Sequence, residues 1–171
     1  MADVESEQPV PEHVVSSGAD NEIQIVEFLL GEDKFAINLF DVKEIVEYTR
    51  ITPLPGSARY IKGIIDLRGE ITTIIDPKQK MGISSLNTNM EQSRIIVIDS
   101  SITKGKTGIL VDDVTTVMSI PTAQIDQKTC DKDDTSYILG IIRHKQGDKD
   151  SDRTDLIVWL DVPRMLKDMG Q

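Results

Sequence analysis

A six-residue segment that occurs twice constrains the fold of this chain more than any other feature. Tyr60–Ile65 reads YIKGII and Tyr137–Ile142 reads YILGII, so five of six positions are identical at a spacing of 77 residues. Beyond the next turn, Ile74–Pro77 resembles Trp159–Pro163. A repeat of this kind indicates duplication of one supersecondary unit.

The apolar composition favours strands over helices. The chain contains 23 Ile and 13 Val but only 11 Leu and 5 Ala, and β-branched side chains pack well on a pleated surface while they lose χ1 freedom in a helix. Short apolar runs that end at Gly, Asp, Pro or Ser predict strands. The predicted strands are Gln24–Leu30, Lys34–Asn38, Lys43–Tyr48, Gly63–Leu67, Ile71–Asp76, Ser93–Asp99, Lys106–Val111, Val114–Ser119, Ile138–Arg143 and Asp155–Leu160. Short helices are expected at Pro77–Met81 and Val162–Met169.

The repeat and the strand pattern together predict an all-β fold with short helices. We expect two similar five-stranded β units side by side in one globule, about residues 23–82 and 93–170, which can exchange strands. The first unit closes a strand pair with the compact turn Leu67–Glu70, in which Gly69 supplies a positive φ. In the second unit a polar loop from Arg143 to Thr154 replaces that turn, so we expect divergent residues of this kind to carry specificity.

Acidic charge is concentrated at one end of the chain. Residues 1–22 contain six acidic side chains and no Lys or Arg, whereas the other 149 residues contain 23 acidic and 19 basic ones. The first 22 residues, which are poor in large apolar side chains, are predicted to be a disordered acidic tail. The acidic balance argues against nucleic acid as a partner and against a polybasic membrane-surface protein.

Neither a signal peptide nor a bilayer-spanning run is found. The N-terminus has no basic start followed by an apolar segment, and apolar runs such as Ile95–Ile98 are far too short to cross a membrane. We therefore expect a cytoplasmic protein with no direct membrane insertion.

Side chains suited to catalysis are scarce. The chain has two histidines, His13 and His144, and one cysteine, Cys130. These residues supply neither a recognisable nucleophile and base pair nor, without carboxylates, the four ligands of a zinc site. We therefore expect no enzymatic activity, no cofactor and no metal site.

One loop keeps a weaker alternative open. Carboxylates alternate in it like the first ligands of a calcium loop; they are Asp148, Asp150, Asp152 and, further on, Asp155. However, Arg153 stands where a calcium loop needs Gly, and Trp159 stands where it needs a bidentate Glu. A solvated polar loop is the ordinary interpretation, and a weak calcium-binding β-protein is the alternative.

Three motifs together resemble the CheW family of chemotaxis coupling proteins. They are Leu54–Gly56, Tyr60–Gly69 and Ile74–Asp76. The hallmark of that family is a proline-containing turn, a hydrophobic-Lys-Gly step, an Asn-Leu-Arg-Gly turn and a strand that ends in Asp. The resemblance covers about residues 23–170, with the motifs in the same order.

The resemblance implies a fold and a function. Members of this family have two SH3-like five-stranded β-barrels packed around a shared core, and they are not enzymes. They are adaptors that bridge the cytoplasmic tip of methyl-accepting chemotaxis receptors and the regulatory domain of the histidine kinase CheA. A coupling domain for another chemosensory kinase system, controlling surface motility or gene expression, is the alternative within the same class.

The resemblance also implies partner-binding residues. Arg68 matches the Arg of the family's Leu-Arg-Gly turn, Glu44 matches a Glu on the receptor-facing surface, and Lys62 and Gly63 match the Lys-Gly step. Each has a structural alternative, since Gly63 suits special backbone geometry and Glu44 and Lys62 suit solvated strand positions. Asp66 replaces the usual Asn, so its carboxylate is expected either to pair with Arg68 or to change the charge preference for partners.

Overall fold

The computed structural model describes residues 21–84, 89–127, 137–145 and 153–167. The elements are β1 (Glu22–Leu30), β2 (Asp33–Asn38), η1 (Leu39–Asp41), β3 (Val42–Glu47), β4 (Ile61–Leu67), β5 (Glu70–Ile75), α1 (Pro77–Met81), β6 (Arg94–Ile98), β7 (Thr107–Val111), β8 (Asp113–Pro121), η2 (Thr122–Gln124), β9 (Ile125–Asp126), β10 (Ile138–Lys145), β11 (Thr154–Leu160) and α2 (Val162–Lys167). The predicted all-β class with short helices is confirmed. Among the described residues, no helix is long and apolar enough to span a bilayer.

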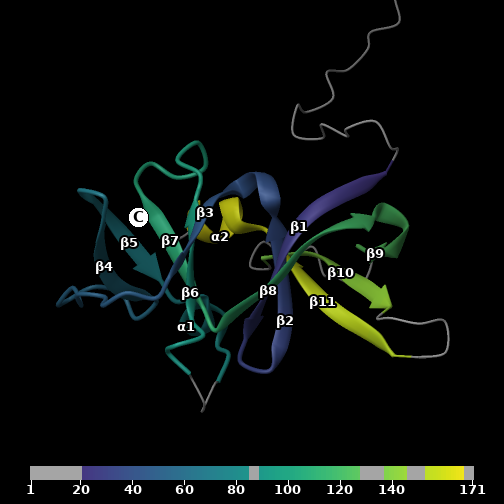
Figure 1. The fold of residues 1–171 in the computed structure, drawn as a ribbon, viewed down its shortest axis with the longest axis horizontal. Coiled ribbons are helices and arrows are strands. Elements are labelled where there is room, and N and C mark those ends of the chain that lie inside the picture. Colours follow the sequence, from purple (N-terminus) through teal and green to yellow (C-terminus); the bar gives the residue numbers. More distant parts are fainter. Residues whose placement is uncertain (1–20, 85–88, 128–136, 146–152, 168–171) are drawn as a thin grey trace, which may run out of the picture.

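The strands form two sheets that lie side by side, with α2 between them (Figure 1). One has five strands in the order β3-β6-β7-β5-β4, and the other has six in the order β8-β1-β2-β11-β10-β9. In the six-stranded sheet the two outer strands, β8 and β9, are joined through η2, so one bent segment supplies both edges. The sheets are SH3-like barrels, called here the five-stranded and the six-stranded barrel.

Strand pairing crosses the boundary between residues 23–82 and residues 93–170. The β1–β2 hairpin pairs with β8 and β11, while the β6–β7 hairpin pairs with β3 and β5. In each barrel the hairpin joins through one parallel pair, β2 with β11 or β7 with β5. Parallel neighbours cannot be linked by a tight turn, so each hairpin comes from a distant part of the sequence.

The repeated hexapeptide has the same backbone role in both barrels. A β-bulge interrupts the register between Ile61 and Gly63 in β4, and another does so between Ile138 and Gly140 in β10. The residue that begins each repeat also accepts an equivalent hydrogen bond, from Asp76 N to the carbonyl of Tyr60 and from Asp161 N to that of Tyr137, both at 2.7 Å. The repeat therefore encodes the bulge and the connection into the helix that follows.

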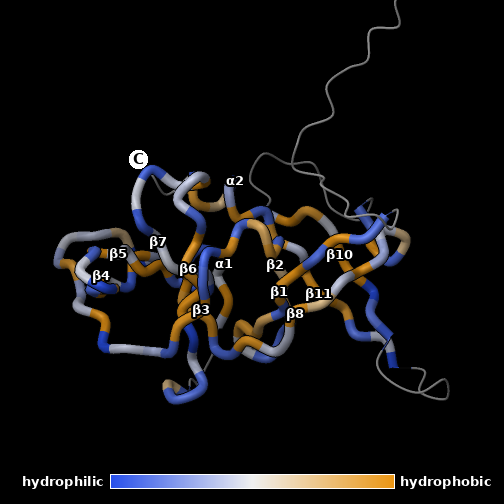
Figure 2. The backbone as a smooth tube through the Cα atoms, turned by 45° about the horizontal axis from the view of Figure 1, so that its top comes forward, coloured by the Kyte–Doolittle hydropathy of each residue, from blue (hydrophilic) through white to orange (hydrophobic). Residues whose placement is uncertain are grey.

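The described residues form three buried apolar clusters. Each barrel has its own: Ile51, Ile65, Ile74, Ile95, Val97 and Leu110 in the five-stranded barrel, and Ile25, Ala36, Ile120, Ile142 and Ile157 in the six-stranded one. The third and largest draws residues from β1, β2, β6, β7 and α2 and is shared by both barrels. Hydrophobic residues accordingly lie along the central strands, and hydrophilic residues lie along outer turns (Figure 2).

Candidate functional site

The β4–β5 hairpin ends in a two-residue turn that exposes an arginine. Arg68 and Gly69 have φ values of 53° and 83°, and Leu67 pairs with Glu70 beside them. Two consecutive positive φ angles define the type I′ turn, which favours Asn, Asp and Gly. Arg68 is therefore held in a conformation that costs a non-glycine residue about 1–2 kcal/mol.

The carboxylate of Asp66 stabilises this turn. Its Oδ1 atom accepts a hydrogen bond of 2.8 Å from the backbone N–H of Gly69. An asparagine side chain offers an equivalent acceptor oxygen, so Asp66 serves the turn as the family's Asn would. Arg68 pairs with a different carboxylate, that of Glu44.

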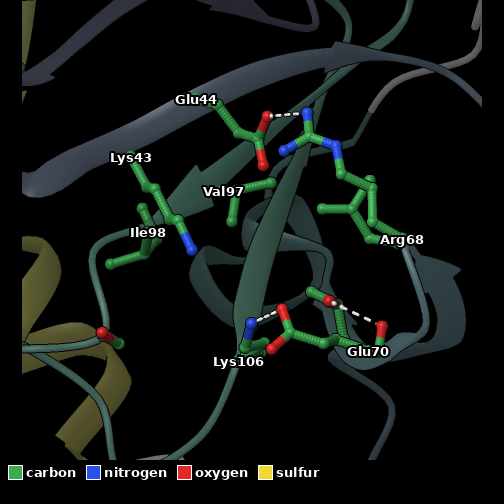
Figure 3. A pocket seen from close by; sticks show the side chains of 10 residues that line it. Lys43, Glu44, Arg68, Glu70, Val97, Ile98 and Lys106 are labelled. Atoms are coloured by element: carbon green, nitrogen blue, oxygen red, sulfur yellow. Dashed lines mark hydrogen bonds and ion pairs between the residues drawn. The ribbon is translucent and has the colours of Figure 1, made fainter.

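Glu44, in β3, and Arg68, in the β4–β5 turn, point toward each other (Figure 3). Arg68 Nη2 donates to Glu44 Oε2 at 2.6 Å, and the two side chains are 72% and 22% exposed. Pairs this exposed contribute only about 0.2–1 kcal/mol to stability. The pair therefore orients the arginine far more than it stabilises the fold.

Charged side chains surround a small hollow beside this pair (Figure 3). Its lining consists of Lys43, Glu44, Leu67, Arg68, Glu70, Thr72, Val97, Ile98, Ser100 and Lys106. Lys106 forms an ion pair with Glu70 on the rim. The hollow has a volume of about 40 Å³, which admits only a few water molecules. An apolar floor with a charged rim of this kind is typical of a protein contact surface.

Lys43 places a further positive charge on this rim. Hydrogen bonds from Ser101 are the main cause that lowers the pKa of the Asp99 carboxyl below its usual value, and the nearby Lys43 ammonium lowers it further. The rim therefore carries charges of both signs. Three of its charged residues, Lys43, Glu70 and Lys106, were not predicted as site residues. As ordinary charged residues in strands or turns they give no sequence signal apart from the position of Glu70 in the Leu67–Glu70 turn.

Lys62 and Gly63 lie outside the hollow, in the β4 bulge. Lys62 is exposed, whereas Gly63 is buried with a φ of 151°. A Cβ atom on Gly63 would lie 2.2 Å from the carbonyl oxygen of Thr52, which is paired with Ile64 through bonds of 2.9 and 2.8 Å. Gly63 therefore lets the segment around Thr52 close the barrel against β4.

The polar loop of the second unit is described only in part. Asp148, Asp150 and Asp152 lie outside the described residues, and the Asp155 carboxylate accepts a 2.7 Å hydrogen bond from Lys34 Nζ. That bond is the main cause that raises the pKa of Lys34 above its usual value. Within the described ranges, no group of three or more His, Cys, Asp or Glu side chains could hold a metal ion.

The fold and this surface define a protein-interaction domain made of two SH3-like barrels. Residues 24–169 match the family model of the CheW-like domain, and the chain therefore belongs to the CheW-like family. It is 28% identical over 150 residues to the chemotaxis protein CheW of Treponema pallidum, an alignment that covers 85% of this chain and 83% of that protein.

Two further relatives agree with this assignment. The chemotaxis protein CheW of Thermotoga maritima is 26% identical over 152 residues, or 86% of this chain and 90% of that one. The crystal structure of the scaffolding protein TtCheW from Thermoanaerobacter tengcongensis superimposes with a TM-score of 0.73 at 29% identity, covering 90% of this chain and 94% of that one. The predicted family and the role of a chemotaxis coupling adaptor are confirmed, and the calcium-binding and other-system alternatives are not favoured.

Proposed function

We propose that this adaptor couples methyl-accepting chemotaxis receptors to a CheA-type histidine kinase in the cytoplasm, binding the receptor tip and the regulatory domain of the kinase without catalysing a reaction itself. The observation that carries the proposal is the presentation of Arg68. This side chain is 72% exposed, is held in a positive-φ conformation and is oriented by Glu44. Strain at an exposed residue is a recurrent property of binding sites.

The proposed contact surface lies on the five-stranded barrel, around the hollow described above. Glu44 and Arg68 form its charged centre, Lys62 extends it along β4, and Gly63 acts through the backbone of the bulge. Ile71 pairs with Asp66 across the same hairpin and is 69% exposed. An isolated apolar side chain beside an arginine is a suitable anchor for a protein partner. Binding energy concentrates in a few side chains that the partner buries on binding.

Two barrels supply two faces, and this favours scaffolding as the mechanism. A body that binds a receptor through one face and a kinase through another converts their encounter into an intramolecular event, which raises the effective concentration of each at the other. No chemical step is needed for this effect. The charges of both signs on the rim suit selective protein contacts, since like-charge juxtaposition disfavours wrong partners.

Reconstitution tests the proposal. A CheA-type kinase and a receptor cytoplasmic fragment are combined with the full chain, and receptor-dependent autophosphorylation is measured. We expect activation to require the chain, to fall strongly with Arg68→Glu and to persist with Lys104→Gln, which changes an exposed lysine of the β6–β7 connection. Failure of the wild-type chain to support activation with cognate partners would overturn the proposal.

A further inference from the structure

Lys78 joins helix α1 of the five-stranded barrel to the six-stranded barrel. Its side chain is almost buried, and its Nζ atom lies 2.8 Å from Oδ1 of Asp112. Asp112 stands between β7 and β8, where the chain passes from one barrel to the other. Its second oxygen accepts a 2.6 Å hydrogen bond from the backbone N–H of Gly31, in the β1–β2 turn. One carboxylate thus connects α1, the crossover and the far barrel.

Lys80, two residues further along α1, makes a second contact that reaches both barrels. Its Nζ atom lies 4.9 Å from the ring centroid of Tyr60 and 5.7 Å from that of Tyr137. Both distances are within the range of cation–π attraction. Tyr60 precedes β4 and Tyr137 precedes β10, so the residues that begin the two repeats share one ammonium group.

Helix α2 occupies the equivalent place after β11 but packs differently. An aspartate side chain caps both helices. Asp76 Oδ1 accepts from the N–H of Lys78, two residues on, and Asp161 Oδ1 accepts from the N–H of Arg164, three residues on. The buried side chains of α2 are apolar: Val162, Met165 and Leu166, which belong to the shared core cluster. The buried side chains of α1 differ, because they include Lys78, and the two lysines of α1 add charged contacts with the other barrel to capping and packing.

The chemistry of these contacts suits fixing the relative orientation of the two barrels more than stabilising their contact. Apolar packing fixes volume and tolerates small rearrangements of shape, whereas a buried ion pair whose carboxylate also accepts a backbone bond is satisfied in one geometry only. The desolvation penalty of such a pair offsets most of its attraction. Its main effect is then to disfavour other arrangements of the two barrels.

We propose that Lys78 and Lys80 are positioning residues that fix the angle between the two barrels, so that the two partner-binding faces are presented in one relative orientation. The angle itself is independent of any partner. Its consequence for signalling rests on the function proposed above, because an adaptor that tilts freely can bind each partner singly while coupling the two poorly.

Distance measurements between the barrels test the proposal on the free protein. Spin labels are attached at Glu47→Cys in β3 and Gln124→Cys in η2, both exposed positions, in a Cys130→Ser background, and the distance distribution is recorded by pulsed electron paramagnetic resonance. We expect a narrow distribution for the parent chain and a broader or shifted one for Lys80→Gln. Lys80→Arg, which keeps a cation over both rings, and the surface control Lys104→Gln should retain the parent distribution.

The ion pair is tested with the double variant Lys78→Met/Asp112→Asn. Asparagine keeps an acceptor oxygen for the N–H of Gly31 while both charges are removed, so the variant avoids an unpaired buried carboxylate. We expect it also to broaden the distribution. Distributions identical to the parent for both Lys80→Gln and the double variant would overturn the proposal.

A comparison of single and joint binding tests the functional consequence. We expect the variants with altered distances to bind the kinase regulatory domain and the receptor fragment separately with parent affinity, and to lose about tenfold in receptor-dependent kinase activation. Undiminished activation with a broadened distance distribution would contradict the role in presentation. If the parent chain itself gives no activation, the coupling function fails while the distance measurement still decides whether the lysines fix the angle.

Discussion

Gly63 and Gly140 occupy the same β-bulge in the two barrels, and each faces the segment that closes its barrel. The space differs between them. A Cβ on Gly63 would lie 2.2 Å from the Thr52 carbonyl oxygen, a backbone atom. One on Gly140 would lie 2.9 Å from the Ile125 Cγ2 atom, in a side chain, and its nearest backbone atom would be the Asp126 carbonyl oxygen at 3.2 Å. Only Gly63 has a φ in the region that favours glycine, at 151°.

We predict that Gly63→Ala is far more destabilising than Gly140→Ala. Alanine at position 63 adds a backbone clash to a disfavoured φ and should cost about 3 kcal/mol or more. At position 140 a shift of the Ile125 side chain, with a small displacement of the Asp126 carbonyl, should limit the cost to about 1–2 kcal/mol. Urea denaturation of the two variants measures the difference, and equal losses would contradict the assignment of the Gly63 contact to backbone.

The positive φ of Arg68 leads to a prediction in which stability and function change in opposite directions. Asn tolerates this conformation far better than Arg, so Arg68→Asn should stabilise the chain by roughly 0.5–1 kcal/mol, after a small loss from the Glu44 pair. The same variant should weaken partner binding. Arg68→Lys, which keeps both charge and strain, is the stability control, and a clear drop in the urea midpoint for Arg68→Asn would refute the prediction.

The sequence predicts local structure well because each local signal has a local cause. Helix α1 spans the predicted Pro77–Met81, since Asp76 caps it and Gly82 ends it with a φ of 69°. The ends of the ten predicted strands agree with the structure within two residues. The two-residue strand β9 was missed, because Ile125 and Asp126 are too few to show an alternating pattern.

Longer-range relationships leave weaker traces in the sequence. The β1–β2 hairpin is followed by β3, β4 and β5, and the β6–β7 hairpin by β8 to β11. Only the long-range pairs of each hairpin, β1–β8 and β2–β11 for the first and β3–β6 and β5–β7 for the second, show which barrel it joins. Glu44 and Arg68 are 24 residues apart, and nothing in their spacing predicts contact. The family resemblance predicts both as partner-binding residues but not that they form a pair. The burial of Lys78 also gives no signal, because its partner Asp112 lies 34 residues away, in the connection between β7 and β8.

The ion pair between Lys78 and Asp112 predicts that the stability losses caused by changing the two residues are not additive. Lys78→Met leaves the Asp112 carboxylate, whose side chain is 14% exposed, without its cation, and should cost about 3–5 kcal/mol. The double variant Lys78→Met/Asp112→Asn should recover much of this loss, since no uncompensated charge remains. A double-mutant cycle by chemical denaturation measures the coupling. Independent, additive losses would show that the two side chains do not act as a pair.

The pKa of Lys34 predicts a specific weakness at alkaline pH. The hydrogen bond to Asp155 raises it above the ordinary value of 10.5, helped by the charge of Glu27, whose carboxylate is buried at 3.6 Å from Nζ. A lysine whose pKa is raised on folding stabilises the native state fully below the unfolded value, and this contribution is lost as pH rises through the higher folded value. The urea midpoint of the wild type should therefore fall above a pH of about 10.5. In Lys34→Met this part of the fall should be absent, although the variant is less stable at neutral pH because Glu27 loses its cation. Parallel pH profiles of the two proteins above that value would contradict the prediction.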